Sequence, residues 1–219
     1  MKVVYNLQKK SLGIALDRLL KYVDKDPHAN IVKLSHKIEP IFNKIFPPEN
    51  FKKFQEVALD KDNVWTQFAL NILNDIDRNV VKQMLLSFGI DAGYYGTKAV
   101  RENREKYKCN IPFIMLLDPP SACNLRCKGC WSAEYGHKFN LSLEEIDSIV
   151  SQGVALGTHL YMFTGGEPLI RKNDILELCR KHKNCTFLAY TNATLIDQKF
   201  CEDKKEVGKL ALAISIEGN

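Results

Sequence analysis

The chain has 219 residues, 45% hydrophobic and 26% charged, which are ordinary globular values and enough for one substantial domain, alone or with a smaller second. Its 31 basic and 26 acidic residues leave a formal charge of +5, and no Lys/Arg block is interleaved with aromatic residues as in a nucleic-acid groove. No apolar run approaches the roughly 18 residues that span a bilayer, and the N-terminus lacks the continuous apolar core of a signal peptide. The sequence therefore predicts a cytoplasmic protein without a membrane span or a nucleic-acid partner.

Residues 1–108 are predicted to form an all-α domain. Apolar residues recur at intervals of three and four in the stretch 12–23, and a second helical stretch, 29–46, is expected to be kinked or broken at Pro40. The strongest helical periodicity covers residues 64–88, which predicts one long helix. No cluster of side chains in this half indicates a catalytic site.

From residue 109 to residue 219, short apolar runs alternate with amphipathic ones. The expected strands cover 111–118, 185–193 and 210–218, and residues 158–168 are expected to form a strand followed by a loop. The expected helices cover 141–157, 173–182 and 195–209. The last helix is poorly amphipathic, with lysines where apolar residues would face a sheet. Alternation of this kind predicts a parallel α/β sheet, in which ligands collect at the carboxyl ends of the strands. The motifs "CNLRCKGC", "TGGEP", "TNA" and "SIEG" each follow or end such a strand.

Three cysteines in "SACNLRCKGCW" form the pattern C-x3-C-x2-C: Cys123, Cys127 and Cys130. A disulfide framework is disfavoured by the odd total of seven cysteines and by a reducing compartment. Structural zinc needs a fourth ligand, for which His137 and Cys109 are the available residues, and a redox C-x2-C pair would leave Cys123 unused. A four-iron cluster uses three thiolates and leaves one iron free for another ligand. The spacing thus favours a cluster and leaves zinc open.

The cysteine motif, followed about 35 residues later by "TGGEP" and then by "TNA" and "SIEG", resembles the radical S-adenosylmethionine (SAM) superfamily. The resemblance is closest to the branch with molybdenum-cofactor, heme-maturation and SPASM-type peptide-modifying enzymes. It implies that Cys123, Cys127 and Cys130 ligate a [4Fe-4S] cluster whose fourth iron takes the amino and carboxylate groups of SAM. With reduced flavodoxin or ferredoxin as electron donor, the reaction would yield a 5′-deoxyadenosyl radical that abstracts hydrogen from an unknown peptide or small-molecule substrate.

The resemblance also implies a set of SAM-binding residues but no catalytic residue. The set is Trp131, Gly165, Gly166, Glu167, Pro168, Thr191, Asn192, Ser215 and Glu217. The two glycines are expected to let the strand-end backbone approach the ligand, and Glu167 to accept a hydrogen bond from the SAM amine. Trp131 would lie near the adenine, with a core aromatic as the alternative.

The resemblance implies a partial (β/α)6 barrel, of which this sequence supplies four strands before Asn219. The fold class expected is therefore α/β, a partial (β/α) barrel of the radical SAM type, incomplete at the C-terminus, with an all-α N-terminal domain. The expected domains are 1–108, helical, and 109–219, the N-terminal part of the barrel. The competing function is a non-catalytic iron–sulfur or zinc-binding module that keeps the fold without the chemistry.

Overall fold

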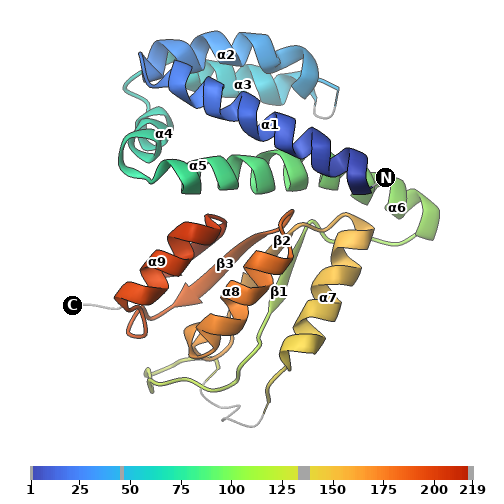
Figure 1. Ribbon diagram of the computed structural model, residues 1–219, viewed down its shortest axis with the longest axis vertical. Helices are drawn as coiled ribbons and strands as arrows, with labels where there is room; N and C mark the ends of the chain where they lie inside the picture. Colours follow the sequence, from blue (N-terminus) through green and yellow to red (C-terminus); the bar gives the residue numbers. More distant parts are fainter. Residues whose placement is uncertain (1, 45–46, 133–138, 217–219) are drawn as a thin grey trace. The chain divides into compact units, whose positions relative to one another are not determined.

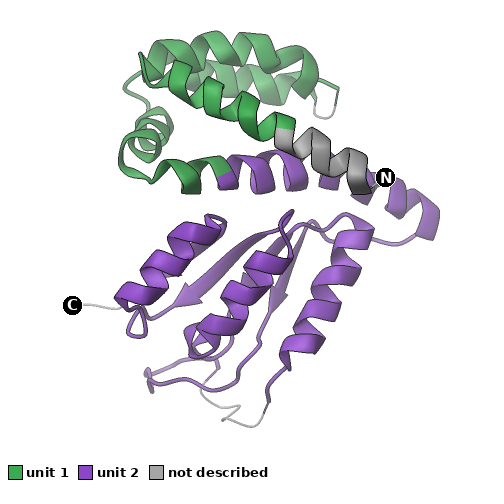
Figure 2. Ribbon diagram, in the orientation of Figure 1, with its two compact units in different colours: residues 1–82 green, residues 83–219 purple. Residues whose placement is uncertain are grey.

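The computed structural model describes residues 2–44, 47–132 and 139–216 (Figure 1). By internal contacts the chain divides into two compact units, residues 1–82 and 83–219 (Figure 2). Within the described residues, no helix has the length and apolar composition needed to cross a bilayer.

The first unit is entirely helical in its described residues, as the sequence predicts. Its helices are α1 (Lys2–Val23), α2 (Pro27–Phe42), α3 (Pro48–Leu59), α4 (Val64–Asp75) and the start of α5 (Arg78–Met84). Helix α2 is capped by Asp26, whose carboxylate accepts a hydrogen bond from the Ala29 N–H, and it continues through Pro40 to its end two residues later. The sequence predicts a break or kink at this proline, but the helix is not broken there. Only Ile41 and Phe42 follow Pro40, so the one hydrogen bond that its missing N–H removes lies in the last turn.

The single long helix predicted over 64–88 is divided in the structure. Helix α4 ends at Asp75, and Ile76 has an extended backbone. The Asp77 carboxylate then accepts a hydrogen bond from the Asn79 N–H, and α5 begins at the next residue, Arg78. A local side-chain cap therefore interrupts a periodic apolar pattern that is itself continuous.

The second unit begins with a π-helical stretch, η1 (Leu85–Gly96), that continues into α6 (Thr97–Tyr107). Hydrogen bonds join these helical residues to the rest of the unit: the Thr186 hydroxyl donates to the Ser87 hydroxyl at 2.8 Å, and the Asn103 side chain donates to the Leu156 carbonyl. The boundary between the two compact units thus lies after residue 82. The domain boundary predicted from the sequence lies after residue 108, where the expected helices give way to expected strands. That boundary stays a prediction.

A four-stranded parallel sheet forms the centre of the second unit, in the order β1-β2-β3-β4. The strands are β1 (Ile114–Leu117), β2 (Leu160–Phe163), β3 (Thr186–Thr191) and β4 (Leu210–Ile214), and the helices between them are α7 (Leu143–Leu156), α8 (Lys172–Lys181) and α9 (Gln198–Val207). The three helices cover one face of the sheet (Figure 1). Among the described residues the sheet does not close on itself, which confirms the partial α/β barrel expected from the sequence.

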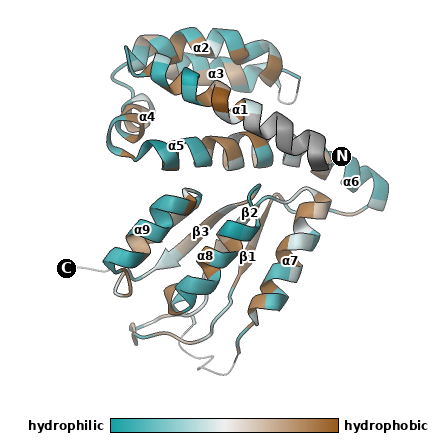
Figure 3. Cartoon of the chain, in the orientation of Figure 1, coloured by the Kyte–Doolittle hydropathy of each residue, from teal (hydrophilic) through white to brown (hydrophobic). Residues whose placement is uncertain are grey.

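The main core lies between these helices and the sheet. Rings of Tyr161, Phe163 and Phe187 stack with centroids 5.8 Å apart and are fully buried. Helices α7 and α8 contribute apolar residues such as Val150 and Ile175 to the same cluster. Figure 3 shows that α7, α8 and α9 each carry both hydrophobic and hydrophilic residues, so each has one face to bury and one to expose.

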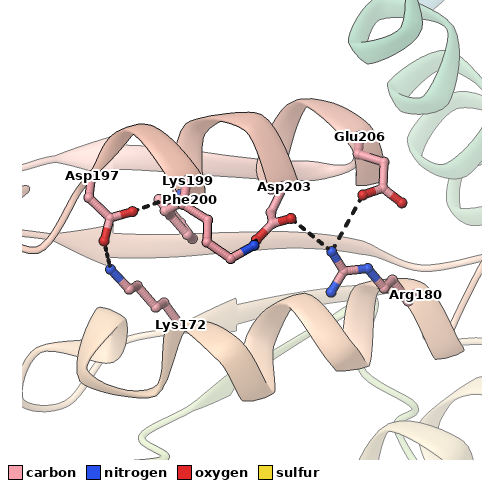
Figure 4. A network of polar contacts seen from close by, with 7 residues as sticks. All are labelled: Lys172, Arg180, Asp197, Lys199, Phe200, Asp203 and Glu206. Carbon is pink, nitrogen blue, oxygen red and sulfur yellow. Dashed lines mark hydrogen bonds and ion pairs between the residues drawn. The ribbon is translucent and has the colours of Figure 1, made fainter.

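The sequence predicts a poor helix over 195–209, but helix α9 is well anchored. Phe200 and Val207 are buried against the sheet, and Asp197 caps the first turn by accepting from the Phe200 N–H at 2.7 Å. The ion pairs that join α9 and its cap to α8 are Lys172–Asp197, Arg180–Asp203 and Arg180–Glu206 (Figure 4). The hydrogen bond from Lys172 holds the pKa of Asp197 below its usual value. Two buried apolar side chains thus dock this charged helix together with its cap and these ion pairs.

Candidate functional site

The three motif cysteines lie on the irregular segment 118–132 that follows β1, here called the cysteine loop. Cys123 and Cys130 are half-buried and Cys127 is exposed. The backbone turns tightly between the last two, with the Cys130 N–H donating to the Cys127 carbonyl at 3.3 Å and Gly129 at a φ of 76°. The Leu125 N–H lies 3.5 Å from the Cys123 sulfur and donates to it.

The donor set of the cysteine loop fits an iron–sulfur cluster. All three thiols are free, and N–H···S contacts such as that to Cys123 are a feature of cluster ligation. The three thiols are not close enough together in the structure to share a metal ion. Within the described residues, no three Cys, His, Asp or Glu side chains form such a group. Of the two alternative zinc ligands, His137 falls outside the described residues, and Cys109 precedes β1 at the opposite end of the strand from the cysteine loop.

Backbone hydrogen bonds join the base of the cysteine loop to the "TGGEP" segment after β2. The Gly166 N–H donates to the Pro120 carbonyl and the Glu167 N–H to the Ala122 carbonyl, both at 2.9 Å. These bonds extend the pairing of β1 with β2 beyond the ends of both strands. The structure thus brings together two of the four predicted motifs at the carboxyl edge of the sheet.

The opposite side of the loop base is closed by residues 139–141. The Ser121 N–H donates to the Phe139 carbonyl at 2.8 Å, and the Leu141 N–H donates to the Pro119 carbonyl at 3.0 Å. At the start of the loop, partial burial raises the pKa of the Asp118 carboxyl above its usual value. The loop base is therefore held on both sides, while the segment with the cysteines projects beyond it.

The two glycines of "TGGEP" allow a close approach, but to protein backbone. A Cβ atom added to Gly166 would lie 2.0 Å from the Ala122 oxygen, and one added to Gly165 would lie 2.8 Å from the Pro120 oxygen. Gly165 also has a φ of 97°, which favours glycine. The sequence predicts that these glycines admit a ligand; the described contacts are with the base of the cysteine loop, and the ligand contact stays a prediction.

Glu167 is buried, with 2% of its surface exposed, and its carboxylate joins the ends of two strands. Oε1 accepts from the Leu169 N–H at 2.9 Å and from the Thr191 hydroxyl at 2.7 Å. Oε2 accepts from the Asn192 N–H at 2.9 Å. Pro168 follows as the first residue of the short 3₁₀ helix η3 (Pro168–Arg171). Because each carboxylate oxygen has two lone pairs, Oε2 retains the capacity to accept from a second donor such as an amine.

The other predicted SAM-binding residues differ in their surroundings. Thr191 is buried, and its hydroxyl also accepts from the Ala193 N–H. Ser215 is exposed at the end of β4, where its N–H donates to the Thr191 carbonyl at 3.0 Å. Trp131 is 61% exposed, which disfavours the alternative of a core aromatic, and Glu217 falls outside the described residues.

Asn124 and Thr194 are not among the predicted site residues, but both bond to the site. The Asn192 side chain donates to the Asn124 side-chain oxygen at 3.0 Å, and Asn124 donates to the Thr194 hydroxyl at 2.7 Å. The sequence signal for this arrangement is the "NAT" stretch, in which the Asn192 side chain accepts from the Thr194 N–H and the intervening Ala193 has a φ of 63°. That signal indicates a tight turn but not the partner 68 residues away.

Comparison of the sequence with known protein families finds a match that includes the cysteine loop and the "TGGEP" segment. The family model of the radical SAM superfamily matches residues 118–219. This segment, just under half of the chain, is therefore similar to the radical SAM superfamily. The resemblance of the cysteine and "TGGEP" motifs is thereby confirmed.

Three curated relatives indicate the branch. The chain is 40% identical to a GTP 3′,8-cyclase of Alkaliphilus oremlandii over 102 residues, which are 43% of this chain and 32% of the cyclase. It is 34% identical to an Fe-coproporphyrin III synthase of Methanosarcina barkeri over 100 residues (44% and 25%). It is 26% identical to an AdoMet-dependent heme synthase of the same organism over 113 residues (50% and 32%). The chain thus spans a third or less of the length of these relatives, and no solved structure matches it significantly.

The radical SAM relatives are enzymes, and their family uses a [4Fe-4S] cluster and SAM together with a reduced electron donor. The cysteine loop and the "TGGEP" segment both lie within the matched residues. The radical SAM segment of this chain therefore includes the part of the fold in which the structure brings these two motifs together.

Proposed function

We propose that this chain acts as a radical SAM enzyme, with Cys123, Cys127 and Cys130 as ligands of a [4Fe-4S] cluster and Glu167 as acceptor for the SAM amine. The observation that carries the proposal is the direct hydrogen bonding of the cysteine loop to the "TGGEP" segment at one edge of the sheet. When bound and reduced, the cluster supplies the electron that cleaves SAM to methionine and a 5′-deoxyadenosyl radical.

The surrounding residues support the two sites in different ways. The Leu125 N–H donates to the Cys123 sulfur and lowers the energy of negative charge there. Thr191 and Asn192 hold the Glu167 carboxylate in place from β3. We assign to Trp131 contact with the adenine, and to the β4 end, with Ser215 and Glu217, contact with the ribose; Gly165, Gly166 and Pro168 would form the turn that faces SAM.

The substrate is proposed only as a class, a small molecule or a peptide. The names of the relatives refer to GTP, a nucleotide, and to coproporphyrin and heme, which are both porphyrins, so no single scaffold is common to all three. Hydrogen abstraction is what such enzymes have in common, and reduced flavodoxin or ferredoxin is the proposed electron donor. The cytoplasmic location predicted from the sequence stays a prediction.

Anaerobic reconstitution with iron and sulfide tests the cluster directly. We expect about four iron atoms per chain and the visible charge-transfer absorption of an iron–sulfur cluster, with zinc below stoichiometry. The same preparation, given SAM and a strong reductant, should release 5′-deoxyadenosine. One zinc ion per chain and no visible absorption would instead support the alternative, a non-catalytic zinc-binding module.

Replacement of Glu167 by glutamine should weaken SAM binding while the cluster is retained. Glutamine keeps one oxygen for Leu169 and Thr191 but removes the charge and presents N–H groups to the Asn192 N–H. Loss of a charge-assisted hydrogen bond predicts about 1.5–3 kcal/mol less favourable binding by calorimetry on the reconstituted protein. Glu177→Gln, on the exposed face of α8, is the matched control. Equal SAM affinity in Glu167→Gln and the control would refute the role of the carboxylate.

A further inference from the structure

Three side chains form a closed ring of hydrogen bonds between the cysteine loop and the turn after β3. Asn192 Nδ2 donates to Asn124 Oδ1 at 3.0 Å, Asn124 Nδ2 donates to Thr194 Oγ1 at 2.7 Å, and Thr194 Oγ1 donates to Asn192 Oδ1 at 2.7 Å. Each member donates once and accepts once within the ring, so all three bonds have one consistent direction.

The ring connects the first cysteine to the carboxylate of the "TGGEP" segment. Asn124 directly follows Cys123 in the chain, and the next residue, Leu125, donates its N–H to the Cys123 sulfur. At the other side, the backbone N–H of Asn192 donates to Glu167 Oε2 at 2.9 Å. Asn192 therefore binds Glu167 through its backbone N–H and Asn124 through its side chain, and so connects the cysteine segment to that carboxylate.

The β3 side of the ring is preorganised. The Ala193 N–H donates to the Thr191 hydroxyl and the Thr194 N–H donates to Asn192 Oδ1, which fixes the turn that contains Ala193 at a φ of 63°. A non-glycine residue adopts this left-handed conformation only when its neighbours hold it there. The cysteine segment thus docks on a rigid partner, beyond the loop base already held by backbone bonds.

We propose that Asn124 and Thr194 are positioning residues that hold the cysteine segment in register with Glu167, so that cluster and SAM are bound at a fixed separation. This role rests on the proposed function for its ligands, but the docking itself is a property of the metal-free chain. Both residues are exposed, so each hydrogen bond of the ring competes with water and contributes modestly to the docking.

Labelling of thiols in the metal-free full-length protein tests the docking. Cys123 is half-buried and Cys127 is exposed, so alkylation followed by peptide mass spectrometry gives the rate at Cys123 with Cys127 as an internal reference. Asn124→Ala removes both side-chain hydrogen bonds between the cysteine segment and the turn after β3, and Thr194→Val removes one of them. Each variant should raise the rate at Cys123 by at least about five-fold, the change expected for loss of one neutral hydrogen bond. Thr194→Ser keeps the hydroxyl and should behave as the wild type, as should Gln152→Ala, which removes an exposed side-chain contact on α7.

The double variant shows whether the two residues act as one ring. Asn124→Ala combined with Thr194→Val should label no faster than Asn124→Ala alone, because Asn124→Ala already removes both bonds between the cysteine segment and the turn. In reconstituted protein, the SAM concentration that half-saturates the change in the cluster's electron paramagnetic resonance spectrum should rise about five-fold in both single variants. Unchanged labelling of Cys123, or additive effects in the double variant, would overturn the proposal that Asn124 and Thr194 hold the cysteine segment in place. A wild-type protein that takes up no cluster would overturn the proposed function. The labelling of the metal-free protein would still show whether Asn124 and Thr194 hold the cysteine segment in place.

Discussion

Alanine at any one of Cys123, Cys127 and Cys130 is expected to reduce the iron of the reconstituted protein from about four atoms per chain to near background. A [4Fe-4S] cluster with three protein thiolates has no replacement ligand when one is removed, since no other described cysteine belongs to the cysteine loop. The visible charge-transfer absorption should be lost together with the iron. Both quantities are measured on the same anaerobic preparation, alongside thermal unfolding to show that the chain is folded.

The structure indicates which cysteine makes the better control. Cys201 is exposed on α9, and Cys201→Ala should leave the iron content unchanged. Cys179→Ala should also retain the cluster, because burial raises the pKa of the Cys179 thiol to about 12 and disfavours the thiolate that would bind a metal. That thiol is packed in the core, so its variant will also be less stable, and Cys201 is the cleaner comparison. Similar iron loss in the loop and control variants would show that the ligands are misassigned.

Much of the second unit can be predicted from the sequence, because its signals are local. The strand and helix alternation gives the parallel sheet, and the "SLEE" stretch gives the capping box at the start of α7, where the Ser142 and Glu145 side chains each bond the other's backbone N–H. The break between α4 and α5 and the π-helical stretch η1 are not predictable in this way. The break between α4 and α5 depends on a single side-chain cap, that of Asp77. The apolar spacing of η1 does not distinguish a π-helix from an α-helix that packs on a sheet.

The candidate site shows the same division between local and distant information. Its motifs can be recognised from spacing alone, and the position of each after a strand follows from the fold class. What the glycines and Glu167 contact cannot be read from the motif, because their partners lie on other segments: Ala122 on the cysteine loop, and Thr191 and Asn192 at the end of β3. The motif residues are bonded to one another, and their contacts with SAM stay predictions.

Gly166→Ala is expected to destabilise the metal-free protein and to prevent cluster uptake. The new Cβ would lie 2.0 Å from the oxygen and 2.5 Å from the carbon of the Ala122 carbonyl, distances that no relaxed structure permits. Because these are backbone atoms, the cysteine loop would have to move away, with loss of the bonds from the Gly166 and Glu167 N–H groups. Overpacking together with these two bonds predicts a loss of about 2–4 kcal/mol in the free energy of unfolding.

The control for this substitution is Gly89→Ala in η1, where an added Cβ would meet nothing within 4 Å. There the expected change is neutral or slightly stabilising, because alanine has the higher helix propensity. Thermal unfolding without metal then separates two roles for Gly166. If the glycine serves only to admit SAM, Gly166→Ala will unfold like the control and load iron normally but will not bind SAM. If it allows the cysteine loop to dock, as the contact with Ala122 indicates, stability will fall before any cofactor is added, and iron uptake will fall with it.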